Sequence, residues 1–544
     1  MRSTMMDVPL MVSSILRHAA LYHGDTEIVS RTVEGPLHRT TYAKTWMRSQ
    51  QLANALAALG LGRGDRVGTL AWNGYRHLEI YYGASGAGHV CHTINPRLFP
   101  DQIAYIINHA GDRVLFVELS FVEMLESIAD RLTGVEAIVV MTDAAHMPTS
   151  RRLPTLLCYE DLLAVQPDRF DWPQLDENEA AAMCYTSGTT GDPKGVLYSH
   201  RSIVLHAMAV CMPDVFALGA GSVAMPVVPM FHVNAWGLPY AAPLVGAKLV
   251  LPGPKLDGAS LHELIIEEEV SFTAGVPTIW MALLDWAAAN DKSFGLLKRV
   301  AVGGSACPPA MFARFRDHKV EVLHAWGMTE TSPVGLANSP KPNRPILTSE
   351  QEVALSAKQG RPLFGMEFRV VGVDGTEIAH DGIAFGNMQV RGPWVAAGYF
   401  RGESEAPQAP PDWFETGDVV TMDADGYVQI VDRSKDVIKS GGEWISSIDL
   451  ESIAMAHPAV QEAAVVAHPD ERWSERPLLV VVRRPGSTLT EREVLAHYEG
   501  KVARWWIPDH AIFVDELPHT ATGKLLKARI RELYGKPSFR VTVG

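Results

Sequence analysis

The 544-residue sequence contains few cysteines and no long apolar segment that could run unbroken through a bilayer. Five cysteines are spread along the chain without a CxxC pair, which argues against a disulfide framework and a cysteine zinc site: Cys91, Cys158, Cys184, Cys211 and Cys307. The region 215–247 has no Asp, Glu, Lys or Arg, but four prolines interrupt it. We therefore expect buried strands and loops there, forming part of a ligand wall, and no membrane-spanning helix. The first residues also lack a sustained apolar run, so we expect no targeting peptide and a reducing, cytoplasmic location.

An excess of positive charge is absent as well. The chain has 48 Lys and Arg against 62 Asp and Glu, a formal net charge of −14. Nucleic acids and anionic membranes require a net basic surface, so these general partners are disfavoured. Any phosphate that the protein binds must then be held by a local site.

The length and the pattern of apolar residues indicate more than one domain, because a single core stops growing at about 250–300 residues. Helical patterns at 42–59 and 261–269 alternate with apolar strands at 66–71, 114–117, 137–140 and 298–302, which predicts α/β layers with mostly parallel sheets. From about 361 to 432, closely spaced strands and turns predict a β-rich subdomain. The charged sequence DRSKD follows, and we place the domain boundary there: residues 1–432 form a large domain and 433–544 a small lid domain. In the small domain, the apolar run 478–482 predicts a strand, and the sequence from Thr490 to Glu493 fits a helix capping box.

Residues 185–196 read YTSGTTGDPKGV and combine hydroxyls, glycines and one lysine. Hydroxyl and backbone N–H donors, close backbone approach at glycine and one mobile cation suit a polyphosphate. The pattern is not a Walker A loop, because Lys194 follows Pro193 and precedes Gly195. An ordinary surface turn is the alternative. The apolar runs 180–185 and 196–198 on either side favour a phosphate loop that a buried sheet supports.

Other short stretches add nucleotide chemistry. WGMTE at 326–330 offers an aromatic ring for a purine, a hydroxyl for phosphate and a carboxylate for Mg²⁺. Asp418 in TGD and Arg433 suit ribose, and Lys524 lies in the polar stretch HTATGK. Each of these residues taken alone also has a purely structural explanation. Trp326 would be a core residue, Asp418 a turn residue, Arg433 part of a solvated linker and Lys524 an ordinary exposed lysine. Their order along the chain favours the functional interpretation.

Together these motifs resemble the adenylate-forming superfamily, which includes acyl-CoA synthetases, luciferases and the adenylation domains of peptide synthetases. The resemblance covers essentially the whole chain and rests on YTSGTTGDPKGV, PMFHVNAWG, GGSA, AWGMTET, TGD, DRSKDVIKSGGEWIS and TATGK. It implies an α/β fold with a large N-terminal domain of two α/β sheets and a β-barrel subdomain. A small, mobile α+β C-terminal domain would rotate between two half-reactions. Members of the family often form homodimers, and this is the only support for a homodimer here.

The resemblance also implies roles for individual residues. ATP and AMP would be bound by Thr186, Ser187, Gly188, Thr189, Thr190, Lys194, Gly303, Gly304, Ser305, Trp326, Gly327, Thr329, Asp418, Arg433 and Lys524. Glu330 would bind Mg²⁺, and the catalytic set would be His232, Thr329, Glu330 and Lys524. The hinge and the coenzyme A site would comprise Lys435, Lys439, Ser440, Gly441, Gly442 and Glu443. The family more often has Tyr at the position of Trp326.

The implied reaction is a carboxylate attack on the α-phosphate of ATP, followed by transfer of the acyl group to coenzyme A. Because both reactants of the first step are anions, the protein must neutralise charge and position the groups. A carrier protein in place of coenzyme A is an alternative. A non-catalytic relative that binds ATP or acyl-CoA is another, but the charged positions Lys194, Glu330, Asp418, Arg433 and Lys524 are all filled.

The acid itself is constrained by the residues after Phe231. Peptide-synthetase adenylation domains usually place Asp there to pair with an amino group, whereas this chain has His232, so we expect an acid without an amino group. We expect the pocket wall to comprise His232, Trp236, Gly303, Trp326 and Pro333, and two indoles predict a short or medium acid. PMFHVNAWG and SGGEWISSIDLE resemble bacterial medium- and long-chain fatty acyl-CoA synthetases and 3-methylmercaptopropionate-CoA ligases. The latter activity is our expectation, with a fatty acyl-CoA synthetase as the alternative.

Overall fold

The computed structural model describes residues 1, 3–153, 156–186, 192–342, 346–372, 374–402, 408–409, 413–440, 443–519 and 525–535. The chain divides into two compact units. The first contains Met1–Ser187, Pro193–Glu367 and Arg391–Phe414, and the second contains Phe368–Val390 and the chain from Glu415 onward. The first unit is therefore interrupted, because the chain leaves it after Glu367 and returns to it at Arg391.

The first unit contains a seven-stranded sheet that is parallel except at one edge, where β9 runs antiparallel to β8. Its apolar strands are buried on both faces, as expected when helices cover a parallel sheet. The order is β7 (Leu156–Cys158), β6 (Ala137–Val140), β5 (Asp112–Val117), β3 (Arg66–Leu70), β4 (Val90–Thr93), β8 (Ala180–Tyr185) and β9 (Gly195–Ser199). This confirms the expected strands and places both ends of the phosphate-loop sequence on neighbouring strands.

A second, nine-stranded sheet lies in the same unit and has a parallel centre from β14 to β1. Its order is β16 (Arg361–Pro362), β15 (Val334–Ala337), β14 (Glu321–Gly327), β13 (Arg299–Val302), β12 (Phe272–Gly275), β10 (Val223–Pro226), β11 (Lys248–Leu251), β1 (Glu27–Arg31) and β2 (Leu37–Thr41). Ligands of open parallel sheets bind beyond the carboxyl ends of the strands. The segments that follow β10, β13 and β14 include the residues expected to line the nucleotide and the acid.

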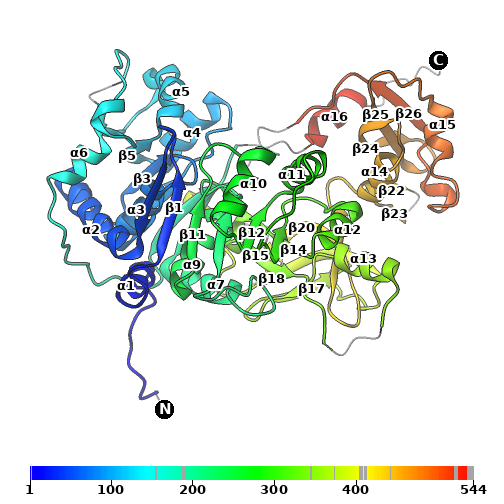
Figure 1. Ribbon diagram of the computed structural model, residues 1–544. Coiled ribbons are helices and arrows are strands. Elements are labelled where there is room, and N and C mark those ends of the chain that lie inside the picture. Colours follow the sequence, from blue (N-terminus) through cyan, green and yellow to red (C-terminus); the bar gives the residue numbers. More distant parts are fainter. Residues whose placement is uncertain are drawn as a thin grey trace. The chain divides into compact units, whose positions relative to one another are not determined.

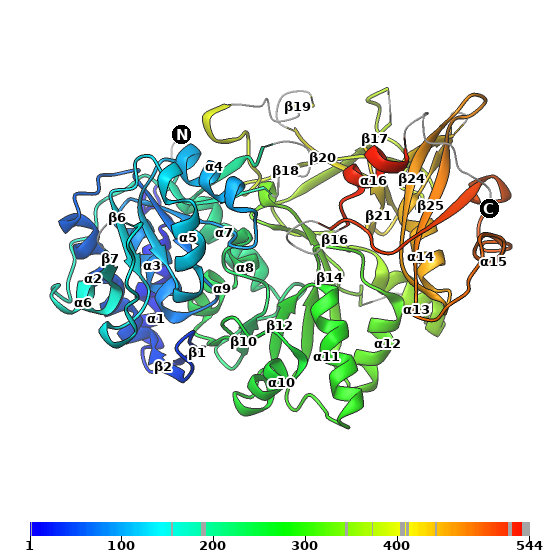
Figure 2. The same cartoon turned by 90° about the horizontal axis from the view of Figure 1, so that it is seen from above.

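Helices flank these sheets, as Figures 1 and 2 show, with α10, α11 and α12 lying side by side near β12 and β14. The longer helices are α1 (Val12–Tyr22), α2 (Tyr42–Ala58), α3 (Tyr75–Gly86), α4 (Pro100–Ala110), α7 (His200–Val210), α9 (Leu238–Val245), α10 (Gly258–Glu267), α11 (Pro277–Ala289), α12 (Pro309–Asp317) and α13 (Ser349–Ala357). Two short ones are α5 (Val122–Ser127) and α6 (Tyr159–Ala164).

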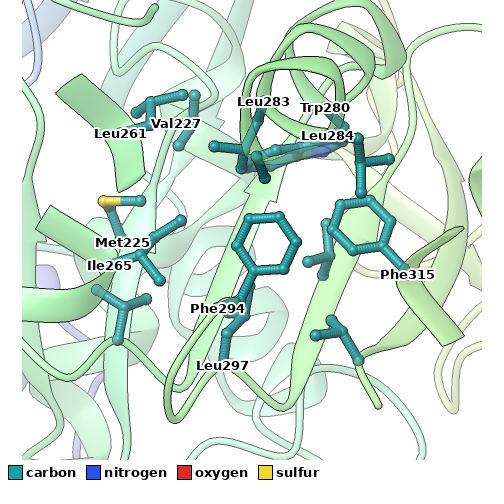
Figure 3. Packing of buried hydrophobic residues seen from close by; sticks show 14 of the residues in the cluster. Met225, Val227, Leu261, Ile265, Trp280, Leu283, Leu284, Phe294, Leu297 and Phe315 are labelled. Carbon is teal, nitrogen blue, oxygen red and sulfur yellow. The ribbon is translucent and has the colours of Figure 1, made fainter. Parts of the chain in front are cut away.

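The core between α10, α11, α12 and the nine-stranded sheet is built from large apolar side chains, several of them shown in Figure 3. Trp280 of α11 is fully buried there, beside Phe294 and Phe315. Burying one such side chain contributes about 1.5–3 kcal/mol. This packing gives the segments after β13 and β14 a rigid base.

The second unit contains a small sheet of its own in the C-terminal module. The order is β23 (Glu443–Ile445), β22 (Ile438–Ser440), β25 (Ser474–Arg483) and β24 (Val460–Asp470), with β26 (His510–Val514) pairing β25. Its helices are α14 (Ser447–Met455), α15 (Glu491–Ala496) and α16 (Lys527–Tyr534). The expected strand at 478–482 lies within β25, and Thr490 and Glu493 form the expected capping box of α15.

A five-stranded sheet accounts for the β-rich texture after residue 360. Its order is β17 (Glu367–Val371), β18 (Phe385–Arg391), β20 (Trp413–Met422) and β19 (Gln408–Ala409), with β21 (Val428–Arg433) pairing β20. β21 ends at the charged sequence where we expect the hinge. The boundary at residues 432–433 itself stays a prediction.

The uncharged region 215–247 differs in part from the expectation of strands and loops. It contains β10 and loops, but also α9, which begins with Leu238 and Pro239 and retains Pro243 inside it. Proline fits the first turn of a helix because the N–H it lacks has no helical partner there. Among the described residues, no helix combines the length and apolar character that crossing a membrane requires.

Candidate active site

The phosphate-loop sequence is closed at its base by two hydrogen bonds just beyond the end of β8 and the start of β9. The Thr186 N–H donates to the Lys194 carbonyl at 2.9 Å, and the Lys194 N–H donates to Thr186 Oγ1 at 3.1 Å. Ser187, Gly188, Thr189 and Thr190 lie outside the described residues. A rigid base thus carries the lysine that we expect to contact phosphate.

The segment Thr329–Thr331 is tied to the phosphate-loop strand and to a later part of the chain. Tyr198 of β9 donates its hydroxyl to the Thr329 carbonyl at 2.7 Å. The Ala396 N–H donates to the Glu330 carbonyl at 2.7 Å, and the Tyr399 hydroxyl donates to Glu330 Oε1 at 2.6 Å. These contacts place Thr329 beside β9 and Glu330 beside the segment 396–399. A shared phosphate and metal site at this point stays a prediction.

Lys194 lies on the other side of Tyr399. Its Nζ is 5.0 Å from the centroid of the Tyr399 ring, a cation–π distance. Tyr399 therefore contacts both the lysine of the phosphate loop and the carboxylate expected to bind Mg²⁺. Sequence reasoning did not identify Tyr399, because no spacing rule connects it to Glu330 or Lys194.

Glu330 suits a hard cation. Its side chain is an oxygen donor, the residue is only 6% exposed, and Tyr399 orients the carboxylate. The described residues contain no group of three or more His, Cys, Asp or Glu that would form a complete protein metal site. A single carboxylate fits Mg²⁺ that arrives with nucleotide phosphates.

The residues expected around adenine lie at the ends of two adjacent parallel strands, β13 and β14. Gly303 and Gly304 directly follow β13, and Gly304 has a φ of 82°, a conformation that favours glycine. Ser305 is exposed, whereas Trp326 on β14 is buried. Gly327 is in close contact with the Pro333 carbonyl, where a side chain would not fit.

Part of the expected wall of the acid pocket is joined by close contacts. A Cβ atom on Gly303 would lie 3.0 Å from Cη2 of Trp236 and 2.8 Å from the Ala325 carbonyl oxygen. Ala325 is the residue before Trp326. Gly327, the residue after Trp326, is in close contact with the Pro333 carbonyl. His232 belongs to the same turn as Trp236, because the Ala235 N–H donates to its carbonyl at 3.2 Å. The structure thus places Trp236 against Gly303, and it connects His232, Trp326 and Pro333 to this contact through neighbouring residues.

Trp236 is carried on a left-handed turn, labelled α8, that spans Val233–Trp236. The four residues have φ values of 47°, 50°, 48° and 56°. At about 1–2 kcal/mol per residue, this conformation costs roughly 4–8 kcal/mol before other contacts offset it. Buried Asn73 anchors the preceding segment: its amide donates to Pro226 and Val228 carbonyls at 2.8 and 3.0 Å and accepts the Met230 N–H at 2.6 Å. Such strain is typical of ligand sites.

His206 of α7 supports this turn from below. Its ring lies against Gly237, and its Nε2 accepts the Val334 N–H at 3.1 Å. Burial lowers the pKa of His206 to about 3, so the ring is neutral and able to accept this bond. No sequence signal distinguished His206 from an ordinary core residue.

In the second unit, Asp418 and Arg433 are directly opposite on antiparallel strands β20 and β21. Arg433 Nε lies 2.8 Å from Asp418 Oδ1, and the aspartate is buried while the arginine is half exposed. The preceding Gly417 has a φ of 73°. A buried carboxylate beside an accessible guanidinium is a suitable arrangement for ribose hydroxyls.

The expected hinge and coenzyme A residues are only partly described. Partial burial lowers the pKa of Lys435. The Lys439 N–H donates to the Glu475 carboxylate at 2.7 Å, and Ser440 Oγ accepts from Arg476 at 3.3 Å. Glu443 begins β23. Gly441, Gly442 and the expected catalytic lysine, Lys524, lie outside the described residues.

The helix that follows the Lys524 sequence is anchored by an ion pair that is mostly shielded from solvent. Lys527 Nζ lies 2.7 Å from Glu451 Oε1 and donates to Ser447 Oγ at 2.6 Å. The nearby carboxylates of Glu451 and Asp432 outweigh burial and raise the pKa of Lys527. Asp432, just before the expected hinge, accepts the Ser447 N–H at 2.6 Å.

The structure has two parallel-centred α/β sheets, a hairpin that carries Lys194 and a buried carboxylate, Glu330, near that lysine. This is the arrangement expected of enzymes that activate a carboxylic acid as an adenylate. Comparison with known protein families gives the same result. The chain belongs to the AMP-binding enzyme family, whose model matches residues 16–400. The model of the AMP-binding enzyme C-terminal domain matches residues 449–524, which shows the separate C-terminal domain.

Curated relatives cover almost the whole chain. It is 51% identical to a medium-chain-fatty-acid–CoA ligase of Ectopseudomonas oleovorans, with 98% of each chain covered. It is 50% identical to a 3-methylmercaptopropionyl-CoA ligase of Ruegeria lacuscaerulensis, also with 98% of each covered. A long-chain-fatty-acid–CoA ligase of Thermus thermophilus is 48% identical over 98% of this chain and 97% of its own. The protein is an AMP-forming acid–CoA ligase.

Solved structures confirm the fold. The anthranilate CoA ligase AuaEII in complex with anthranoyl-AMP superposes with a TM-score of 0.83 at 27% identity, covering 97% of this chain and 98% of its own. ATP-bound MatB from Rhodopseudomonas palustris gives a TM-score of 0.80 at 25% identity, with 96% and 99% covered.

Proposed function

We propose that this ligase acts on a short or medium carboxylic acid, with 3-methylmercaptopropionate as the preferred substrate. The acid and ATP would form an acyl adenylate and pyrophosphate, and coenzyme A would then displace AMP to give the acyl-CoA. The observation that supports the size limit is the contact of the Trp236 indole with Gly303. An indole at this position shortens the space that an acyl chain can enter.

The chemistry of the wall supports the sulfur-containing acid. A thioether is polarizable and packs favourably against aromatic rings. Trp236 is fixed by the left-handed turn, and Trp326, the residue after Ala325, is also buried. No acidic side chain follows Phe231 to pair with an ammonium group, which supports an acid without an amino group.

A medium- or long-chain fatty acid is the second candidate. The relatives named for medium-chain, 3-methylmercaptopropionyl and long-chain substrates are 51%, 50% and 48% identical, so overall similarity does not separate them. The choice depends on the few residues that form the pocket wall.

In the first half-reaction, Thr186, Lys194 and the loop between them would hold the ATP phosphates, and Thr329 would donate to the α-phosphate. Glu330 would hold Mg²⁺, which when bound supplies positive charge to the phosphates. Trp326 with residues 303–305 would line adenine, while Asp418 and Arg433 would bind ribose. Lys524 would neutralise the charge that develops as the carboxylate attacks. His232 would lie beside the reacting carboxylate.

In the second half-reaction, rotation about Lys435 would remove Lys524 and bring residues 439–443 to the path of the pantetheine thiol. Because the acyl adenylate hydrolyses in water, exclusion of solvent between the two steps protects it. We also propose a reducing cytosolic location, which five cysteines without disulfide bonds support.

The test is a substrate series. AMP and acyl-CoA are measured with ATP, Mg²⁺ and coenzyme A for acetate, butyrate, 3-methylmercaptopropionate, octanoate and palmitate. The proposal expects the highest kcat/KM for 3-methylmercaptopropionate. A maximum at octanoate or palmitate would overturn it and identify a fatty acyl-CoA synthetase.

A further inference from the structure

Tyr399 joins two charged groups that come from separate parts of the first unit. Its hydroxyl donates to Glu330 Oε1 at 2.6 Å, and its ring centroid lies 5.0 Å from Lys194 Nζ. A phenol hydroxyl carries a proton and a carboxylate oxygen accepts one, so Tyr399 is the donor in this hydrogen bond. One side chain thus contacts both the expected metal ligand and the expected phosphate cation.

The backbone around Tyr399 reinforces this contact. The Ala396 N–H donates to the Glu330 carbonyl at 2.7 Å, and Ser332 Oγ donates to the Trp394 carbonyl at 2.8 Å. The segment 394–399 is therefore bound both to Glu330 itself and to Ser332, two residues beyond it. The backbone that carries Tyr399 is therefore held in place where its hydroxyl donates to the Glu330 carboxylate.

Phe400, the residue after Tyr399, packs against the end of the phosphate loop. A Cβ atom on Gly195 would lie 3.2 Å from Cβ of Phe400 and 3.1 Å from the Tyr185 ring. Only a glycine allows this approach without displacement of its neighbours. Residues 394–400 thus contact the end of the loop through Phe400 and its lysine through Tyr399.

We propose that Tyr399 is a positioning residue that orients the Glu330 carboxylate for Mg²⁺ and places Lys194 beside it before the nucleotide binds. The inference rests on the proposed roles of Glu330 and Lys194. A carboxylate that can rotate must be ordered when the metal nucleotide arrives, whereas one held by a phenol is already ordered. Groups that hydrogen-bond a metal ligand typically contribute 10- to 100-fold to metal affinity or activity.

The central experiment uses Tyr399→Phe, which keeps the ring beneath Lys194 and removes the hydroxyl. ATP binding is followed by calorimetry at a series of Mg²⁺ concentrations and in EDTA, together with ATP–pyrophosphate exchange. We expect the Mg²⁺ concentration at half-maximal exchange to rise on the order of tenfold. ATP affinity in EDTA should stay within about twofold of wild type, because the ring and Lys194 remain.

Two further variants separate the hydroxyl from the ring. Tyr399→Leu removes both and should also weaken ATP binding in EDTA. Tyr198→Phe is the matched control, because its hydroxyl donates to the neighbouring Thr329 carbonyl and not to the carboxylate. It should leave the Mg²⁺ midpoint at the wild-type value. An equal shift in Tyr198→Phe and Tyr399→Phe would indicate general loosening of the site and overturn the inference.

Glu330→Gln distinguishes failure of the inference from failure of the proposed metal role. If Glu330→Gln leaves the Mg²⁺ midpoint unchanged, the proposed role of Glu330 is wrong. If it raises the midpoint but Tyr399→Phe does not, the positioning role is wrong. We expect no further shift when Tyr399→Phe is added to Glu330→Gln, because the two groups act as a unit. An additive shift in the double variant would also contradict the inference.

Discussion

Removal of the Trp236 indole should lengthen the acyl chain that the enzyme accepts. In the structure the ring closes on Gly303, where even a Cβ atom would lie 3.0 Å from Cη2. Methylenes that reach this wall gain no burial in wild type, so kcat/KM should not rise with chain length beyond it. In Trp236→Ala the vacated space can bury them.

The magnitude follows from the cost of exposing methylenes to water. Each buried methylene contributes about 0.8 kcal/mol, and 1.4 kcal/mol corresponds to a factor of about ten. Octanoate has four more methylenes than butyrate, so full burial yields up to about 3 kcal/mol, or roughly 200-fold in kcat/KM. Partial collapse of the cavity reduces this value.

The assay measures kcat/KM for the even-numbered acids from butyrate to decanoate in wild type and Trp236→Ala. Trp236→Phe keeps most of the packing and should give an intermediate ratio of octanoate to butyrate. Trp286→Phe serves as control, because this indole packs against the core beneath the nine-stranded sheet. The same octanoate-to-butyrate ratio in wild type and Trp236→Ala, with both folded by circular dichroism, would refute the pocket argument.

Three further predictions concern catalysis, the C-terminal module and pH. Lys524→Ala should reduce adenylate formation by about 100-fold or more, while thioester formation from added acyl adenylate stays near wild type; equal loss in both steps would contradict domain rotation. Lys527→Met leaves the mostly buried Glu451 without its cation and should destabilise the module by about 3 kcal/mol in urea unfolding, whereas the exposed Lys501→Met should have little effect. Folded His206 resists protonation down to about pH 3, but the unfolded residue binds a proton near pH 6.5, so stability is lost as the pH falls through this window. Between pH 7 and 5, His206→Gln should lose about 2 kcal/mol less unfolding free energy than wild type. An equal loss in both proteins over this pH range would contradict the prediction.

The elements that local patterns specify were predicted well. The apolar runs around YTSGTTGDPKGV are β8 and β9, and the strands expected at 114–117 and 137–140 lie within β5 and at β6. Thr490 and Glu493 form the capping box because the relevant hydrogen bonds join residues only three apart. Such features depend on neighbouring residues, which a single sequence displays directly.

Features that depend on distant contacts were not predictable in the same way. Val233 and Ala235 have no intrinsic preference for a left-handed conformation, and the turn forms because the surrounding segments are anchored, for example by Asn73. Tyr399 meets Glu330 only in the tertiary structure, because the two residues are 69 positions apart in the sequence. Burial lowers the pKa of His206 for the same reason: the tertiary structure, and not the local sequence, removes water from its ring.

The interruption of the first unit also restricts the positions at which two such enzymes can be recombined into a functional chimera. The chain enters the second unit at Phe368 and returns to the first for Arg391–Phe414, the segment that carries Tyr399. A recombination between relatives with its crossover before Arg391 would replace Tyr399 together with the C-terminal module and leave Glu330 and Lys194 from the other parent. A crossover after Phe414 inherits all three from one parent. Chimeras joined beyond Phe414 should therefore retain nucleotide binding more often than those joined near Glu367.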